Sequence, residues 1–90
     1  MADKFRGVVT EVIDGDTFDI RLTEVLESND YEYNQVERIR IAGIDAPEAE
    51  TFDGIVAQTE LESRIKGETV EITVEARDEY SRIVGTYEII

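Results

Sequence analysis

The spacing of apolar residues along this chain changes once, and that change limits the folds open to it. Isoleucine, valine and phenylalanine alternate with polar residues through most of the 90 positions, which is the two-residue period of half-buried strands. Over Gly54–Lys66 the period lengthens, because Ala57, Leu61 and Ile65 recur every four residues, as on one face of a helix. Gly67 follows as the residue type that commonly ends a helix. The pattern predicts one helix set among short strands.

Three strands are expected before the helix and two after it. A polar, turn-forming stretch from Leu26 to Gln35 is expected to be a loop. The order β-β-β-α-β-β is that of the OB-fold, a mainly β Greek-key barrel of five strands, and an open α+β sheet is the alternative. The strands are predicted over Phe5 to Ile13, Phe18 to Thr23, Val36 to Gly43, Val70 to Glu75 and Arg82 to Ile90.

Composition narrows the chemistry as well as the class of protein. A chain of 90 residues is expected to form a single domain over 1–90. It contains no cysteine, histidine or tryptophan, which excludes disulfides, thiolate zinc sites and imidazole bases. The first residues are charged and no apolar run is long enough to span a membrane. We therefore expect a cytoplasmic protein with no membrane association.

The charge balance is strongly acidic. Twenty-two Asp and Glu residues against nine Lys and Arg residues give a net charge of −13. A field of this sign repels nucleic acid and other polyanions, and it opposes the compact state unless salt screens it. The composition suggests a protein that works in concentrated salt, a hypothesis that thermal unfolding in increasing KCl would test.

The first candidate site is the stretch VIDGDTF, in which Asp14 and Asp16 flank Gly15 between two apolar runs. Asp-Gly favours a type I′ hairpin turn, so a solvated turn is the ordinary interpretation of this stretch alone. An EF-hand is excluded, because the fifth and twelfth positions counted from Asp14 are Phe18 and Val25.

Two further features become informative only in combination with that turn. Ile44 to Glu48 (IDAPE) places two acids where the third strand ends. Arg40 lies on that predicted strand, and Arg82 lies just after a predicted turn. Each feature alone is common at a protein surface. Together they supply what phosphodiester cleavage needs: carboxylates for a divalent ion such as Ca²⁺, Mg²⁺ or Mn²⁺, a carboxylate to activate water, and two guanidiniums to stabilise the charge on phosphorus.

In this combination the chain resembles the thermonuclease family of staphylococcal-nuclease-like domains. The resemblance rests on VIDGDTF (12–18), RIRIAGIDAPE (38–48) and DEYSRI (78–83), and it extends from about Val8 to Tyr87. It implies an OB-fold barrel and Ca²⁺-dependent hydrolysis of DNA and RNA that releases 3′-nucleotides.

The resemblance also implies roles for individual residues. Asp16 and Asp45, helped by the backbone carbonyl of Ala46, would hold Ca²⁺, whereas Asp14 would belong only to the turn. Catalysis and substrate binding would fall to four other residues: Glu48 as the general base, Arg40 and Arg82 on the scissile phosphate, and Tyr80 on a terminal nucleotide phosphate.

Departures from the family pattern keep other functions open. Glu79 replaces a phosphate-facing lysine, and the family's helices and tyrosines beyond the fifth strand have no counterpart before Ile90. We therefore expect a monomeric nuclease with weak activity that prefers single-stranded or denatured DNA or RNA. The alternatives are a non-catalytic OB-fold binding module and a shortened nuclease subdomain with a vestigial site.

Overall fold

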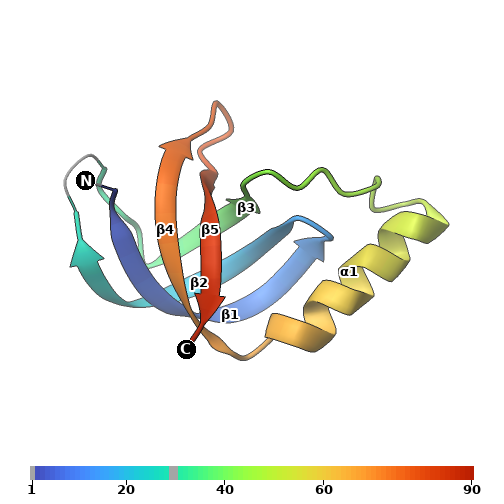
Figure 1. Cartoon of the computed structure of the whole chain (residues 1–90), viewed down its shortest axis with the longest axis horizontal. Coiled ribbons are helices and arrows are strands. Elements are labelled where there is room, and N and C mark those ends of the chain that lie inside the picture. The colour runs from blue at the N-terminus through green and yellow to red at the C-terminus, as the bar shows by residue number, and fades with distance from the viewer. Residues whose placement is uncertain (1, 29–30) are drawn as a thin grey trace.

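The computed structural model of the chain describes residues 2–28 and 31–90. Within these residues the elements follow the predicted order, and the strands close into a barrel in the order β1-β2-β3-β5-β4 (Figure 1). The barrel confirms the OB-fold prediction and overturns the open-sheet alternative. The elements are β1 (Lys4–Asp14), β2 (Thr17–Glu27), β3 (Val36–Ile41), α1 (Phe52–Ile65), β4 (Thr69–Arg77) and β5 (Ile83–Ile89).

Closure of the barrel depends on one parallel pairing. The strand β1 pairs antiparallel with both β2 and β4, whereas β3 pairs in parallel with β5, with Ile39 opposite Ile83. The alternating apolar residues of all five strands therefore face one interior, and Leu61 and Ile65 of the helix extend this core. The strand β2 continues to Glu27, past the start of the predicted loop at Leu26, because β1 is long enough to pair with it.

The β1–β2 turn differs from the predicted type I′ turn. Neither Gly15 nor Asp16 has the positive φ that a type I′ turn requires. The carboxylate of Asp14 instead accepts a hydrogen bond from the amide of Asp16 at 3.0 Å, which stabilises another turn geometry. Glycine is needed here for space, because a Cβ on Gly15 would lie 2.7 Å from the Cβ of Ala57 and 2.9 Å from that of Ala46.

The helix begins two residues earlier than predicted, at Phe52, and ends at Ile65. Its N-cap is Thr51, whose hydroxyl accepts a hydrogen bond from the amide of Gly54 at 3.0 Å. Gly67 has a φ of +80°, as predicted for the residue that ends the helix. In the described part of the chain no helix has the length and apolar character needed to cross a membrane.

The contact between α1 and the preceding loop fixes the position of that loop. Gly54 is buried against the backbone carbonyl of Glu48, and a Cβ on Gly54 would lie 1.8 Å from that oxygen. The same carbonyl accepts hydrogen bonds from the amide and hydroxyl of Thr51, at 3.0 and 2.7 Å. The start of the helix therefore holds the segment that carries the predicted site residues Asp45 and Glu48.

Candidate active site

Three connections gather around the end of β3. The amide of Ile41 donates to the carbonyl of Asp16 in the β1–β2 turn at 2.8 Å. The next amide, that of Ala42, donates to the carbonyl of Gly85 on β5 at 2.8 Å, and there the chain leaves the barrel. Asp78 and Arg82, from the turn between β4 and β5, line the same pocket as the residues at the end of β3, so residues from distant parts of the sequence meet there.

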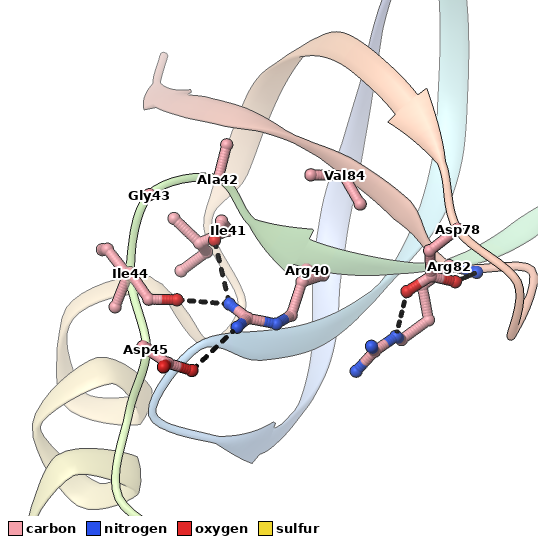
Figure 2. Close-up of a pocket in the computed structure, with 9 residues that line it drawn as sticks. All are labelled: Arg40, Ile41, Ala42, Gly43, Ile44, Asp45, Asp78, Arg82 and Val84. Carbon is pink, nitrogen blue, oxygen red and sulfur yellow. Dashed lines mark hydrogen bonds and ion pairs between the residues drawn. The ribbon is translucent and has the colours of Figure 1, made fainter.

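Arg40 joins the two predicted metal ligands. Its guanidinium forms ion pairs of 3.2 Å with Asp16 Oδ2 and 3.2 Å with Asp45 Oδ1. It also donates to the backbone carbonyls of Ile41 and Ile44, which line the path of the loop (Figure 2). The two carboxylates differ in environment, because the side chain of Asp16 is 10% exposed and that of Asp45 is fully exposed.

Both carboxylate oxygens of Asp16 accept hydrogen bonds. The hydroxyl of Thr17 donates to its Oδ1 at 2.8 Å, and the amide of Ala46 donates to its Oδ2 at 3.0 Å. Burial acts to raise the pKa of Asp16, but hydrogen bonding with Asp14, Ala46 and Thr17, and the charge of Arg40, outweigh it and lower the pKa.

Asp14 responds in the opposite direction. Burial first, and then the neighbouring Asp16 carboxylate, raise the pKa of Asp14. Asp16 is therefore the member of this pair that carries the negative charge most firmly. The hydrogen bond from the Asp16 amide to Asp14 is consistent with the predicted place of Asp14 in the turn, and the role of Asp16 in the site stays a prediction.

Arg82 is held by the turn between β4 and β5. The carboxylate of Asp78 accepts hydrogen bonds from the amides of Tyr80 and Arg82, at 2.9 and 2.8 Å, and from Arg82 Nε at 2.7 Å. Burial acts to raise the pKa of Asp78, but these donors outweigh it and hold the pKa below its usual value. Ser81 adopts a φ of 65° to close the turn, and the guanidinium of Arg82 lies 5.4 Å from the centre of the Tyr80 ring.

The two arginines line one pocket of about 410 Å³. Figure 2 shows Arg40 reaching toward the loop that carries Asp45, while Arg82 lies against Asp78 on the opposite wall. The pocket thus presents two guanidiniums and two carboxylates, in a molecule where acids outnumber bases by 22 to 9. The remaining lining residues are Ile41, Ala42, Gly43, Ile44 and Val84.

The structure brings together some of the predicted site residues and leaves others at the margin. Asp16, Arg40 and Asp45 are in direct contact, and Arg82 shares the pocket of Arg40. Glu48 is exposed and lies outside the lining of that pocket.

For two further residues the predicted roles stay predictions. Tyr80 is 71% exposed, and its ring lies against Arg82 at the pocket edge. Ala46 contacts the site through its amide rather than its carbonyl, so the role predicted for that carbonyl stays a prediction.

The oxygen atoms that surround Arg40 are of the type that a hard cation such as Ca²⁺ binds. Over residues 2–28 and 31–90, no three acidic side chains cluster closely enough to form a complete metal cage. Two carboxylates nevertheless converge on a positive group, the Arg40 guanidinium, beside the carbonyl of Ile44. Ca²⁺ prefers such oxygen ligands and takes about six to eight of them, so the residues present fit a site that water would complete.

Three residues that support the site had no predicted role. Asp78 positions Arg82, Thr17 donates to Asp16, and Gly54 seats the loop. An acid four residues before Arg82 was visible in the sequence, as was the Thr after Asp16. The need for Gly54 depends on a backbone contact between separate segments, which no local pattern reveals.

Comparison with known proteins finds similarity to nucleases. No family model matches the chain. An uncharacterized endonuclease of Escherichia coli is 38% identical over 79 residues, which cover 88% of this chain and 45% of that protein. A micrococcal nuclease of Shigella flexneri is 33% identical over 81 residues, with 90% and 41% covered. A probable endonuclease of Arthroderma otae, LCL3, is 37% identical over 98 residues, with 89% and 35% covered.

These similarities confirm that the chain resembles the thermonuclease family. They extend over 88 to 90% of the chain. The chain spans less than half the length of the curated relatives it matches. What is shared is thus a nuclease-like domain, and the remaining parts of those relatives have no counterpart in the alignment.

Proposed function

We propose that this domain is a Ca²⁺-dependent phosphodiesterase that cleaves DNA or RNA in the pocket beside β3. The observation that carries the proposal is the joint contact of Arg40 with Asp16 and Asp45, next to Arg82, in an open pocket. Relatives named endonuclease and micrococcal nuclease support the same class of reaction.

The arginines are suited to hold the scissile phosphate. The hydrogen bond from Arg82 to Asp78 uses Nε, which leaves the two terminal nitrogens of the guanidinium for phosphate oxygens. Arg40 engages its carboxylates through Nη1 and Nη2, so it must share or exchange these partners when phosphate enters. Two guanidiniums on one phosphate would stabilise the negative charge that grows in the transition state.

Asp16 and Asp45 would hold the Ca²⁺ ion. When bound, the ion would act as a Lewis acid that neutralises charge on the phosphate. Asp16 is ready for this role, since its lowered pKa keeps it ionised and Thr17 and Ala46 fix its orientation. Asp45, fully exposed on the loop, can turn toward the ligand without breaking buried contacts.

Glu48 is proposed as the general base that takes a proton from the attacking water. Its side chain is exposed, but its backbone is fixed by Thr51 and by the close approach of Gly54. The backbone of Glu48 would therefore be fixed, while its exposed side chain could move to contact the substrate.

The acidic surface bears on the choice of substrate. A net charge of −13 weakens the approach of a long polyanion, and few basic residues exist to release its counterions. We propose that the enzyme acts as a monomer and prefers single-stranded or denatured nucleic acid, whose flexible backbone can enter the pocket. We expect slow cleavage compared with more basic members of the family.

The test is cleavage of heat-denatured DNA with Ca²⁺ or with EDTA, by the native protein and by Glu48→Gln. We expect activity only with Ca²⁺, and a loss of at least about 100-fold on substitution, because the base can no longer accept a proton. Glu50→Gln, which removes one exposed acid two residues away, is the matched control and should keep nearly full activity.

Two outcomes would contradict the proposal in different ways. Cleavage that persists in EDTA, or in Glu48→Gln, would refute the mechanism. No cleavage at all, with Ca²⁺ still raising the melting temperature, would favour a metal-binding domain with a vestigial site.

A further inference from the structure

The outward face of α1 is apolar where a solvated helix would carry charges. Phe52 is 79% exposed, Ile55 54% and Val56 39%. The chain as a whole is 34% charged, so a face of this kind is unusual for it. Exposed apolar residues that gather in one place commonly mark an interaction surface.

Helical spacing gathers these residues into one row. At about 100° per residue, positions 52, 55, 56, 59 and 63 fall on the same side of the helix. Leu61 and Ile65, on the opposite side, are buried against the barrel. Figure 1 shows α1 at the edge of the molecule, beside the β1–β2 turn. We call the row the outer stripe; it consists of Phe52, Ile55, Val56, Thr59 and Ser63.

Acidic residues border the apolar part of the outer stripe on one side. By the same helical geometry Asp53 and Glu60 lie along this border, and Arg64 lies beyond Glu60, toward the barrel. On the other border Glu62 is paired with Lys66 at 3.9 Å, beside the polar end of the stripe. An apolar row with one acidic border is complementary to a helix whose apolar face is flanked by lysines or arginines.

We propose that the outer stripe is a docking surface for a basic amphipathic helix of a partner protein. Charge argues against the other occupants. A second copy of this chain would bring one net charge of −13 against another, and nucleic acid or an anionic membrane would meet the same repulsion. The proposal is independent of the nuclease activity, because it rests on the face of α1 turned away from the barrel.

The proposal can be tested with a defined probe. The probe is a labelled 15-residue peptide of leucine and lysine at helical spacing, and its control has the same composition in an order that spreads leucine around the helix. By fluorescence anisotropy at moderate salt, we expect the amphipathic peptide to bind at least about tenfold more tightly than the control. Replacing Phe52, Ile55 and Val56 with serine should remove that difference, with only a small loss of melting temperature because Phe52 and Ile55 are more than half exposed.

A second variant tests whether removal of exposed apolar surface elsewhere on the protein also weakens peptide binding. Val25 and Val36 are exposed on the barrel at 48% and 57%, and Val25→Ser with Val36→Ser should leave peptide binding unchanged. Equal binding of the two peptides, or binding that survives the triple substitution, would overturn the proposal. So would a dimer in sedimentation equilibrium that the triple substitution dissolves, because a second copy would then be the occupant.

Discussion

Two ion-pair clusters lie at opposite ends of β3, and they differ in how completely their carboxylates are occupied. Near the start of the strand, the side chain of Glu37 is 4% exposed and Arg77 lies 3.2 Å from it. Its second oxygen accepts from the amide of Asn34 at 2.7 Å and from Arg77 at 3.3 Å. At the far end, the fully exposed Asp45 contacts Arg40 through a single oxygen at 3.2 Å.

The groups around Arg77 also show that the cluster at the start of β3 is more completely bonded than the cluster at its end. Arg77 also donates to the carbonyls of Ser81 and Glu32, and it lies 5.9 Å from the centre of the Tyr33 ring. The Tyr33 hydroxyl donates to Asp3 at 2.6 Å, and burial, followed by this bond, raises the pKa of Tyr33. A cluster with every group engaged stabilises the barrel, whereas a cluster with an open carboxylate can accept a ligand.

The largest expected effect on stability comes from breaking the buried cluster. Glu37→Ala leaves the Arg77 guanidinium and the Asn34 amide without their shared acceptor. Removing one partner of a buried ion pair commonly costs about 3 kcal/mol or more. Urea unfolding should show a loss of this size, while the response of the melting temperature to Ca²⁺ should remain.

Glu75→Ala, an exposed acid on β4, is the matched control and should change stability little. A loss for Glu37→Ala no greater than that of the control would show that the buried cluster is dispensable. The distinction between a structural cluster and an open one would then fail.

The barrel was predicted well from the sequence because each strand and the helix carries its own local pattern of apolar residues. Alternation of apolar residues and the change of period at the helix follow from which faces are buried, and they are repeated in each element. The same alternation places Glu37 on the buried face of β3, with Ile39 and Ile41. The sequence does not show its partners, because Asn34 and Arg77 reach its carboxylate only in the folded chain.

The site was predictable to the extent that motifs identify it. Asp16, Arg40, Asp45 and Arg82 came from family motifs, and the structure brings them to one place. The type I′ turn was wrong because the Asp14 side chain stabilises a different geometry, and propensity alone does not register such a bond.

The second expected effect concerns the support of the open cluster. In Gly54→Ala the new Cβ would lie 1.8 Å from the Glu48 carbonyl, so the loop must move. Such overpacking costs about 1–3 kcal/mol, and the better helix propensity of alanine returns up to about 1 kcal/mol. We expect a modest loss in urea unfolding, with displaced amide resonances from Asp45 to Glu48 and weaker binding of Ca²⁺.

Gly67→Ala is the matched control for that prediction. Gly67 has a φ of +80° and open space around its Cβ position, so alanine should cost about 1 kcal/mol through backbone strain alone. It should leave the amide resonances of the site loop in place. If both variants disturb the loop equally, the Gly54 contact is not what positions it.

The smallest effect on stability is expected for a substitution of Asp45, measured without Ca²⁺. A matching substitution of Asp16 then distinguishes the two carboxylates that contact Arg40. Asp45→Asn changes a fully exposed side chain, so the melting temperature without Ca²⁺ should stay within error of the native value. Asp16→Asn should lower it, because asparagine cannot accept equally from Thr17, Ala46 and Arg40 in a buried position. We expect Ca²⁺ to raise the melting temperature of the native protein, as the proposed site requires, and both variants to lose that rise because each removes one proposed anionic ligand. If Asp45→Asn keeps that rise in full, Asp45 is not a ligand, and the open carboxylate serves only to hold Arg40 toward the loop.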